Sequence, residues 1–103
     1  MSEYFITYHG GNEPASPEEG SAHKAKFGAW VMGLGDAVVN PGTPLGQTMT
    51  LSSNGEASEG GSSTMSGFSI VKADSMDAAV EIAKACPFLD MGGTLEVSEL
   101  MEM

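Results

Sequence analysis

Few side chains in this sequence could transfer a proton or attack a substrate. The chain contains two histidines, His9 and His23, and one cysteine, Cys86. Histidine titrates near neutral pH, which suits it to accept and release protons during a reaction. The cysteine precedes a proline and has no cation beside it to activate it, so we expect a packed, inert thiol. One cysteine and two isolated histidines do not supply the converging ligands of a metal site, so we expect no metal.

His23 is the candidate catalytic residue. It lies four residues before Phe27 and shares one face of a predicted helix with Trp30 and Leu34. Side chains at this spacing line the same face of a helix, so we expect the imidazole to point toward the sheet, where it could act as a general base. The alternative is a structural histidine in the first helical turn, bonded to a loop carbonyl.

Three further residues are candidates for contact with a substrate. Tyr8 and His9 end the first predicted strand, where pockets often open, and Trp30 lies on the helix face of His23. Strand ends also border turns, so His9 is alternatively a turn-stabilising residue, and Tyr8 could equally belong to the core. The candidate site therefore combines His23 as the catalytic residue with Tyr8, His9 and Trp30 as substrate-binding residues.

The charge balance excludes several classes of protein. The chain has 14 acidic residues against four lysines, and its formal net charge is −10. Binding to phosphate backbones needs clustered lysine and arginine, so we expect neither nucleic-acid nor anionic-membrane partners. No apolar run approaches the ~20 residues that span a bilayer, and no secretory signal precedes the first strand pattern. We therefore expect a soluble, cytoplasmic protein, and no cofactor, because the glycine pairs lack the spacing of a phosphate-binding loop.

The N-terminal half predicts a strand followed by a helix. Residues 4–8 are aromatic and β-branched, which is typical of a strand. Residues 16–19 resemble a helix start, and residues 40–42 (Asn-Pro-Gly) are expected to end the helix. Gly28 and Gly35 are expected to let another element approach this helix closely. Its apolar stripe consists of Phe27, Trp30, Val31, Leu34 and Val38.

The middle of the chain alternates and then becomes polar. Residues 46–52 place their apolar side chains on one face, which predicts a half-buried strand. The pair Asn54-Gly55 is typical of a type I′ hairpin turn. Residues 53–66 are rich in glycine and serine, and we predict a flexible loop here with a short return strand at residues 56–58.

The last third predicts a strand, a helix and a strand. Residues 67–73 and 94–98 have strand patterns, Asp74 or Ser75 caps the helix between them, and Pro87 ends it. The chain is therefore one α+β domain of order βαββαβ, spanning residues 1–103. Because crossovers are right-handed, it should form a ferredoxin-like sandwich with both helices on one face of an antiparallel sheet. The inner face of the second helix is predicted to consist of Met76, Ala79, Val80 and Ala83.

A sheet covered by helices on one side leaves its other face exposed. Here that face would carry aromatic and aliphatic residues from the strands at 4–8, 68–71 and 95–97. An exposed apolar patch of this kind usually marks an interface. We therefore expect a homodimer that forms through the open face of the sheet.

The C-terminal pattern also resembles a known family. Residues 68–79, followed by residues 83–87, resemble the YCII-related family, including its DGPF-type branch. The members share a strand, an acidic-capped helix rich in alanine, a proline stop and a final strand like residues 94–97. The resemblance covers nearly the whole chain, and it implies a dimeric α+β barrel with a small substrate held between helix and sheet. It also implies a site histidine early in the first helix, a place that His23 occupies.

The chain departs from each branch of this family in one place. The DGPF-type branch has an Asp-Gly-Pro-Phe segment shortly before its third strand, and residues 58–65 of this chain contain none. The other branch has an aspartate before the proline that ends the second helix, and this chain has Cys86 there. His23 therefore lacks the carboxylate partner that would assist acid–base work.

Two functions stay open on the sequence alone. The first is a cofactor-free acid–base enzyme of the lyase, isomerase or dehalogenase type, in which His23 moves a proton on a small molecule. The second is a non-catalytic module that binds a small metabolite or docks a protein partner. The resemblance and the position of His23 favour the first function. The missing carboxylate and the absence of an evident cationic anchor favour the second.

Overall fold

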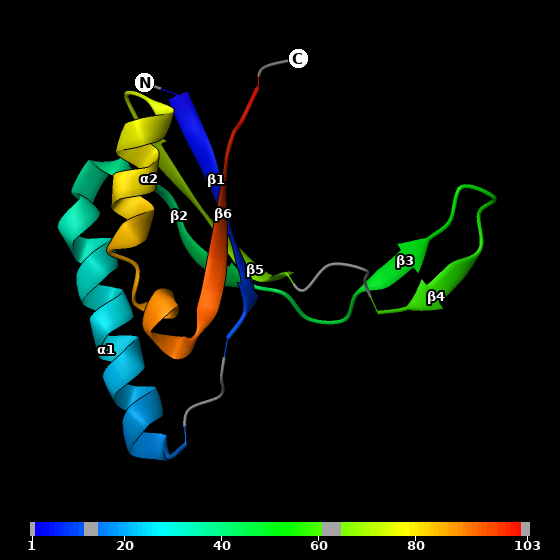
Figure 1. Cartoon of the computed structure of the whole chain (residues 1–103), viewed down its shortest axis with the longest axis horizontal. Helices are drawn as coiled ribbons and strands as arrows, with labels where there is room; N and C mark the ends of the chain where they lie inside the picture. Colours follow the sequence, from blue (N-terminus) through cyan, green and yellow to red (C-terminus); the bar gives the residue numbers. More distant parts are fainter. Residues whose placement is uncertain (1, 12–14, 61–64, 102–103) are drawn as a thin grey trace.

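A layer of two helices packs on a four-stranded sheet, and a separate two-stranded hairpin projects from this body (Figure 1). The structure is a computed structural model that describes residues 2–11, 15–60 and 65–101. In chain order, the elements are β1 (Ser2–Gly10), α1 (Pro17–Leu34), the 3-10 helix η1 (Gly35–Ala37), β2 (Val38–Pro44), β3 (Met49–Leu51), β4 (Ala57–Glu59), β5 (Met65–Ala73), α2 (Met76–Lys84), the 3-10 helix η2 (Pro87–Met91) and β6 (Gly93–Glu99).

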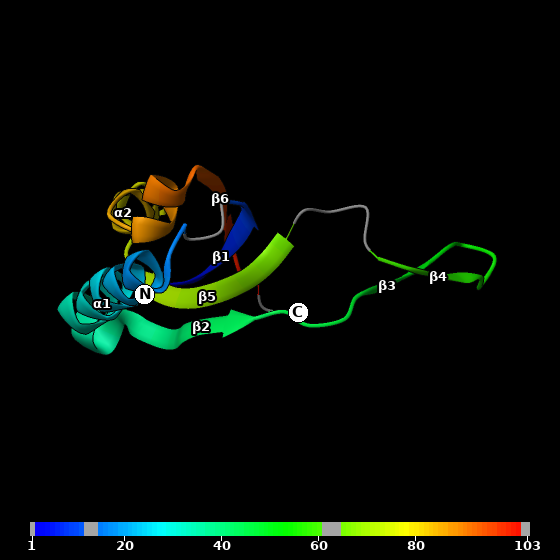
Figure 2. The ribbon, with the colours of Figure 1, turned by 90° about the horizontal axis from the view of Figure 1, so that it is seen from below.

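The four strands of the main sheet are antiparallel and lie in the order β2-β5-β1-β6. Strands β5 and β1 are therefore central, whereas β2 and β6 are edges. Both helices cover the same face of this sheet (Figure 2). With the projecting hairpin set aside, the order of elements is βαββαβ, and the predicted ferredoxin-like α+β sandwich is confirmed.

The second strand of the main sheet is β2, and not the strand predicted at residues 46–52. The sequence pattern placed Val38 on the helical stripe, but Val38 is the first residue of β2. Helix α1 ends earlier, at Leu34, because Gly35 adopts a positive φ of 56°. The stop predicted at residues 40–42 consequently lies inside a strand.

An edge position explains why β2 accepts Pro41. Proline cannot donate to a strand ladder, so within sheets it is confined to edges and bulges. The pairing of β2 with β5 is irregular on both sides of Asn40. Asn40 Oδ1 accepts hydrogen bonds from Gly42 N (2.9 Å) and Thr43 Oγ1 (3.2 Å), which satisfies donors at this irregularity. Residues with the chemistry of a turn therefore form part of the sheet.

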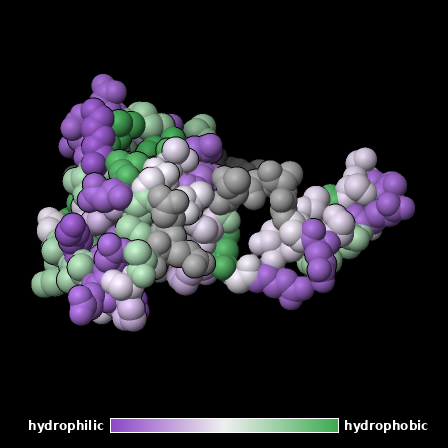
Figure 3. All heavy atoms as spheres, turned by 60° about the horizontal axis from the view of Figure 1, so that its bottom comes forward, coloured by the Kyte–Doolittle hydropathy of each residue, from purple (hydrophilic) through white to green (hydrophobic). Residues whose placement is uncertain are grey.

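Residues 45–60 form the projecting hairpin, which we call the arm. Its two strands, β3 and β4, pair only with each other within the described structure. Figure 3 shows the arm standing apart from the body. Met49 is 46% exposed and Leu51 is 71% exposed, so the face that the sequence predicted to be buried is open to solvent. A two-stranded hairpin alone is marginally stable in water, so the arm contributes little to the stability of the body.

The tip of the arm partly matches the prediction. The short return strand predicted at residues 56–58 is confirmed as β4. The predicted type I′ turn at Asn54-Gly55 is wrong. Such a turn needs a positive φ at both central residues, and of these two residues only Gly55 has one (φ 89°). Gly55 N donates to Ser52 O (2.9 Å), which closes the turn one residue earlier. The loop predicted at residues 53–66 is described at residues 53–60 and 65–66, which form a turn, β4 and the start of β5. Residues 61–64 of the predicted loop lie outside the described residues.

The predicted helix starts are confirmed by their caps. Ser16 Oγ accepts from Glu19 N (3.2 Å), and the Glu19 carboxylate accepts from Ala15 N (2.7 Å). The pair differs from a capping box in one respect, because Glu19 bonds the residue before the N-cap rather than Ser16 itself. Ser75 Oγ accepts from Ala78 N (3.1 Å), so the serine, rather than Asp74 before it, caps α2.

Helix α2 buries Ala79 and Ala83 as predicted, and Val80 is half-buried. The prediction for Met76 was wrong, because its side chain is 40% exposed. A helical side chain covers the turn that precedes its own residue. Met76 is the first residue of α2, so no helical turn precedes it for its side chain to cover. Neither described helix is both long and apolar enough to cross a bilayer.

The core lies between the helices and the central strands. Helix α1 has no fully buried residue, and it packs on the core through three half-buried side chains, those of Phe27, Trp30 and Leu34. The predicted packed thiol is confirmed, since Cys86 is buried and burial raises its pKa. The buried apolar side chains are Tyr4, Ile6, Tyr8, Val71, Ala73, Ala79, Ala83 and Cys86.

Tyr8 brings a hydroxyl group into this core. Ser69 Oγ donates to Pro41 O (3.1 Å), so the Tyr8 hydroxyl is left to donate to Ser69 Oγ. The Cys86 thiol lies beside the same hydroxyl. Burial raises the pKa of Tyr8 from 10.0 to about 12, because a phenolate would lose its hydration in this place.

The raised pKa of Tyr8 predicts a loss of stability in strong base. The folded chain keeps the proton until about pH 12, whereas the unfolded chain releases it near pH 10. The stability that this group contributes is therefore complete below about pH 10 and falls by about 2 to 3 kcal/mol as the pH rises to about 12. Urea unfolding of wild type and Tyr8→Phe across this range tests it. The wild-type curve should fall more steeply, and parallel curves would contradict the prediction.

Candidate functional site

A pocket of about 410 Å³ opens between α1, the β2–β5 edge of the sheet and η2. We call it the His23 pocket. It lies on the helix-covered side of the sheet, and its size falls in the range of small-molecule sites. Its lining residues are Tyr8, His23, Lys24, Phe27, Gly28, Gly42, Thr43, Pro44, Ser66, Gly67 and Phe88.

Aromatic rings form the walls of the His23 pocket. The Tyr8 ring lies 5.2 Å from the Phe88 ring and 6.2 Å from the Phe27 ring, measured between centroids. The Phe27 ring in turn lies 6.3 Å from the imidazole of His23. These four side chains come from β1, α1 and η2, so the walls form only when the strand, the helix and the turn have packed together.

Gly67 and Gly28 both line the pocket, and they have different roles. A Cβ on Gly67 would come within 2.9 Å of Thr43 O and 3.4 Å of the Tyr8 ring, so β2 and Tyr8 pack directly on this backbone. Gly28 behaves differently, because a Cβ there would meet no described atom within 4 Å. The same holds for Gly35, so the predicted close approach of another element at these two glycines was wrong. Gly28 instead faces the open space of the pocket.

The position of Phe88 depends on another glycine. A Cβ on Gly93 would lie 2.1 Å from Phe88 Cε2, which is far inside contact distance. The Phe88 ring therefore lies directly over the backbone of β6, and from there it reaches the Tyr8 ring. The sequence pattern gave no sign that Phe88 would line the pocket.

His23 lies in the second turn of α1 and is half-buried, with its ring against Phe27. The structure thus places the predicted catalytic histidine in the pocket. No Asp or Glu of the described chain lines this pocket. An imidazole that acts as a general base here would be oriented by its packing and by the substrate, rather than by a carboxylate from the described lining.

Tyr8 also lines the pocket, and it presents its ring rather than its hydroxyl. The hydroxyl is held by Ser69, which lies outside the lining, and the raised pKa makes the phenol a poor proton donor at neutral pH. Tyr8 therefore forms a wall of the pocket, where a flat ligand would contact it.

Trp30 and His9 lie away from the His23 pocket. The indole Nε1 of Trp30 donates to Ile82 O at the far end of α2 (3.0 Å), so Trp30 ties the two helices together. His9 lies on the opposite face of the sheet, because it is one residue from Tyr8 and side chains alternate along a strand. Tyr8 and His23 are thus the sequence-predicted residues that the structure brings together.

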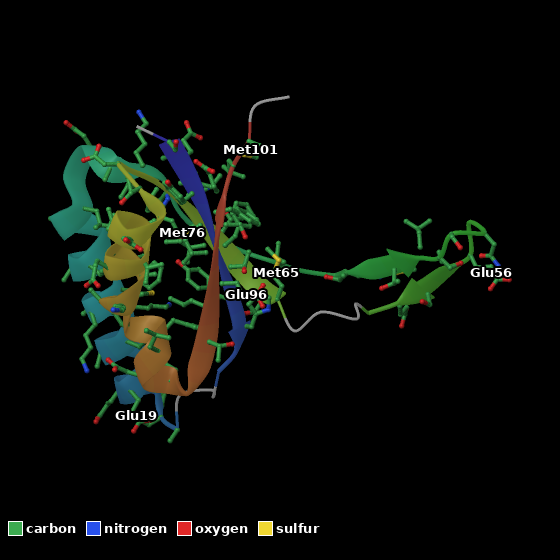
Figure 4. The ribbon with its side chains drawn as sticks, turned by 45° about the horizontal axis from the view of Figure 1, so that its top comes forward. Glu19, Glu56, Met65, Met76, Glu96 and Met101 are labelled. Carbon is green, nitrogen blue, oxygen red and sulfur yellow. The ribbon has the colours of Figure 1, made fainter. Side chains whose placement is uncertain are left out.

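On that opposite face, His9 belongs to a polar cluster. Its Nε2 lies 2.8 Å from Thr7 Oγ1 and 3.8 Å from a Glu96 carboxylate oxygen. Figure 4 labels Glu96 on β6 and Met65 on β5, the two strands that flank β1, and Met65 is the residue of β5 paired with His9. No group of three or more metal-ligating side chains occurs in the described ranges.

The same face carries an apolar group that no helix covers. Phe5 and Phe68 lie on neighbouring strands with their rings 5.2 Å apart, and Ile70 follows two residues along β5. All three are half-buried in the single chain. They lie on the side of the sheet from which the arm projects, opposite the helices (Figures 1 and 2).

Comparisons with known proteins place the chain in a family. A family model for the YCII-related domain matches residues 8–103. A search of curated proteins found no match. Among solved structures, 5-chloro-2-hydroxyhydroquinone dehydrochlorinase (TftG) from Burkholderia phenoliruptrix AC1100, in complex with 2,5-dihydroxybenzoquinone, is similar with a TM-score of 0.58 and 19% identity. The alignment covers 97% of this chain and 95% of that one, so the two share a fold. With its family model matched over nearly the whole length, this chain belongs to the YCII-related family.

Proposed function

We propose that this protein is a cofactor-free acid–base enzyme of the lyase, isomerase or dehalogenase type, and that His23 transfers a proton on a small molecule bound in the His23 pocket. The observation that carries the proposal is the position of His23. His23 lines a pocket of substrate size, and its ring lies against that of Phe27. The single buried cysteine fits a reducing compartment, so we propose a cytoplasmic location.

The relative with a solved structure suggests one reaction to try. Its name states that it removes chloride from a chlorinated hydroxyhydroquinone, and its ligand is a six-membered ring with two hydroxyls and two carbonyls. When a chlorinated hydroxyhydroquinone loses hydrogen chloride, the C–Cl bond breaks, chloride leaves and a group must accept the proton that is released. His23 could accept this proton. The apolar walls of the pocket would exclude water from the ring.

A binding module without catalysis is the second candidate function. It is favoured by the absence of a carboxylate from the described lining of the pocket. In this case the pocket would hold a small metabolite, and His23 would contribute a contact. Variants that separate binding from turnover distinguish the two functions.

The first test replaces His23. We expect wild type to release chloride from 5-chloro-2-hydroxyhydroquinone, and His23→Gln to lower this rate by about 10²- to 10⁴-fold, the usual contribution of a general base. Thermal unfolding should change little, because His23 is only half-buried. Lys26→Gln, on the same helix and outside the pocket lining, is the control that should keep the rate. Chloride release that survives His23→Gln would exclude His23 as the base.

The second test fills the pocket from Gly28. Gly28→Leu places a side chain in the open space of the pocket, whereas Gly33→Leu places the same side chain on an exposed position of α1. Each change should raise stability by up to about 1 kcal/mol, because leucine is the better helix former. We expect only Gly28→Leu to abolish thermal-shift responses to small metabolites. Equal responses in both variants would show that ligands bind elsewhere.

We also propose that the protein forms a homodimer through the open face of the sheet. The uncovered group of Phe5, Phe68 and Ile70 supports this, as does the arm on the same side with Met49 and Leu51 exposed. Apolar burial must overcome the repulsion between two chains of charge −10. Added salt screens this repulsion, so the dimer should tighten as the ionic strength rises.

Sedimentation equilibrium tests the dimer. At tens of micromolar we expect a dimer for wild type, and a monomer for Phe68→Glu, which puts a charge on the proposed interface. Met32→Glu adds the same charge to a side chain that is 83% exposed on α1, and it should stay dimeric. A wild-type monomer at both low and moderate salt would exclude the interface.

A further inference from the structure

Lys24 is a cation at a pocket whose described lining holds no acid. It lines the His23 pocket together with His23, its neighbour on α1. The chain has only four lysines against 14 acidic residues. A second pocket, of about 280 Å³, also has a lysine, Lys84, and no acid in its lining. The sequence showed no evident cationic anchor, because the spacing of single lysines does not reveal which of them borders a pocket.

The other lysines lie elsewhere. Lys24 and Lys26 are both exposed on α1, but Lys26 does not line the pocket. Lys84 pairs with Glu81 on the surface of α2 (3.0 Å). Lys72 is exposed on β5, in register with Glu3 on the neighbouring strand. Within the described residues Lys24, Lys26 and Lys72 make no ion pair. Of these three, Lys24 lines the His23 pocket, where an anionic ligand would be its counter-charge.

The remaining walls select the shape of the ligand. Tyr8, Phe27 and Phe88 present aromatic rings whose neighbouring centroids lie 5.2 to 6.2 Å apart. Aromatic rings gain from offset or edge contacts with another flat ring, beyond the gain from buried area. The volume of about 410 Å³ leaves room for a ligand of one ring beside these walls.

We propose that the His23 pocket binds a small single-ring aromatic anion, a carboxylate or a phenolate. The ring lies against Tyr8, Phe27 and Phe88, and the anionic oxygen is held by Lys24 Nζ. This arrangement puts the ring next to the imidazole of His23. The inference rests on the proposed function in one respect, since it takes the same pocket to be the binding site.

Three probes separate charge from ring shape. Benzoate has both the ring and the charge, benzamide keeps the ring without the charge, and cyclohexanecarboxylate keeps the charge without a flat ring. In ligand-observed NMR titrations of the full-length protein we expect benzoate to bind best. Benzamide or cyclohexanecarboxylate binding as tightly as benzoate would overturn the charge or the aromatic part of the proposal, respectively.

A matched pair of variants tests Lys24. Lys24→Gln and Lys26→Gln each remove one positive charge from α1, so they change the net charge and the long-range field equally. We expect Lys24→Gln to weaken benzoate binding by roughly threefold to fivefold, the effect of one exposed ion pair. It should leave benzamide binding unchanged, and Lys26→Gln should leave both unchanged. Equal losses in the two variants would overturn the assignment of Lys24.

The failure of this inference is distinguishable from the failure of the proposed enzyme. Benzoate binding that persists in Gly28→Leu would place the ligand outside the pocket and overturn the inference. Benzoate binding that depends on Lys24 and is lost in Gly28→Leu supports the inference, whatever happens to chloride release. If His23→Gln leaves chloride release unchanged in that case, only the catalytic role of His23 is lost.

Discussion

The alternation of side chains along β1 is the constraint on which the other features depend. This strand is paired on both sides, with β5 and with β6, so its register cannot shift without moving the whole sheet. Tyr4, Ile6 and Tyr8 therefore point to the helices, whereas Phe5 and the polar cluster at its end point to the open face. One strand thus supplies both the core with its pocket wall and the surface proposed as the dimer interface.

The pocket exists because α1 packs loosely on this strand. Helix α1 has no fully buried residue, and Gly28 leaves space where another side chain would have reached toward the sheet. The helix is instead held at defined points, such as the hydrogen bond from Trp30 to the backbone of α2 and the capping hydrogen bonds of Ser16 and Glu19 at its start. A helix fixed at such points, with glycine between them, leaves a cavity without losing its place in the fold.

Tyr8 links the pocket to the core. Its ring forms a wall of the pocket, while its hydroxyl is satisfied by Ser69, which in turn donates to Pro41 O on the edge strand. The buried hydroxyl therefore fixes β2 relative to the central strands, as buried polar groups must find partners. The irregular strand at the edge is consequently a structural part of the site, because Gly42, Thr43 and Pro44 form its rim.

The sequence by itself determined the order of elements, the helix caps, the inert cysteine and the helix that carries His23, because these follow from local periodicity and local hydrogen bonds. The sequence also implied that Tyr8 and His9 point to opposite faces of the sheet, because neighbouring side chains alternate along a strand. The tertiary structure decided which alternating segment joins the sheet. Residues 38–44 carry two prolines and a glycine but pair with β5, while residues 49–51 alternate well and pair only within the arm.

The tertiary structure also decided the site. Phe88 reaches the pocket only because Gly93 lets its ring lie on β6, and Lys24 differs from Lys26 only by the side of α1 that each occupies. Local sequence cannot show either relation, because both depend on contacts between elements that are far apart in the chain. The physical reason is that pairing and packing between such elements are set by the whole sheet, whereas periodicity reports only on neighbours within one turn or one strand.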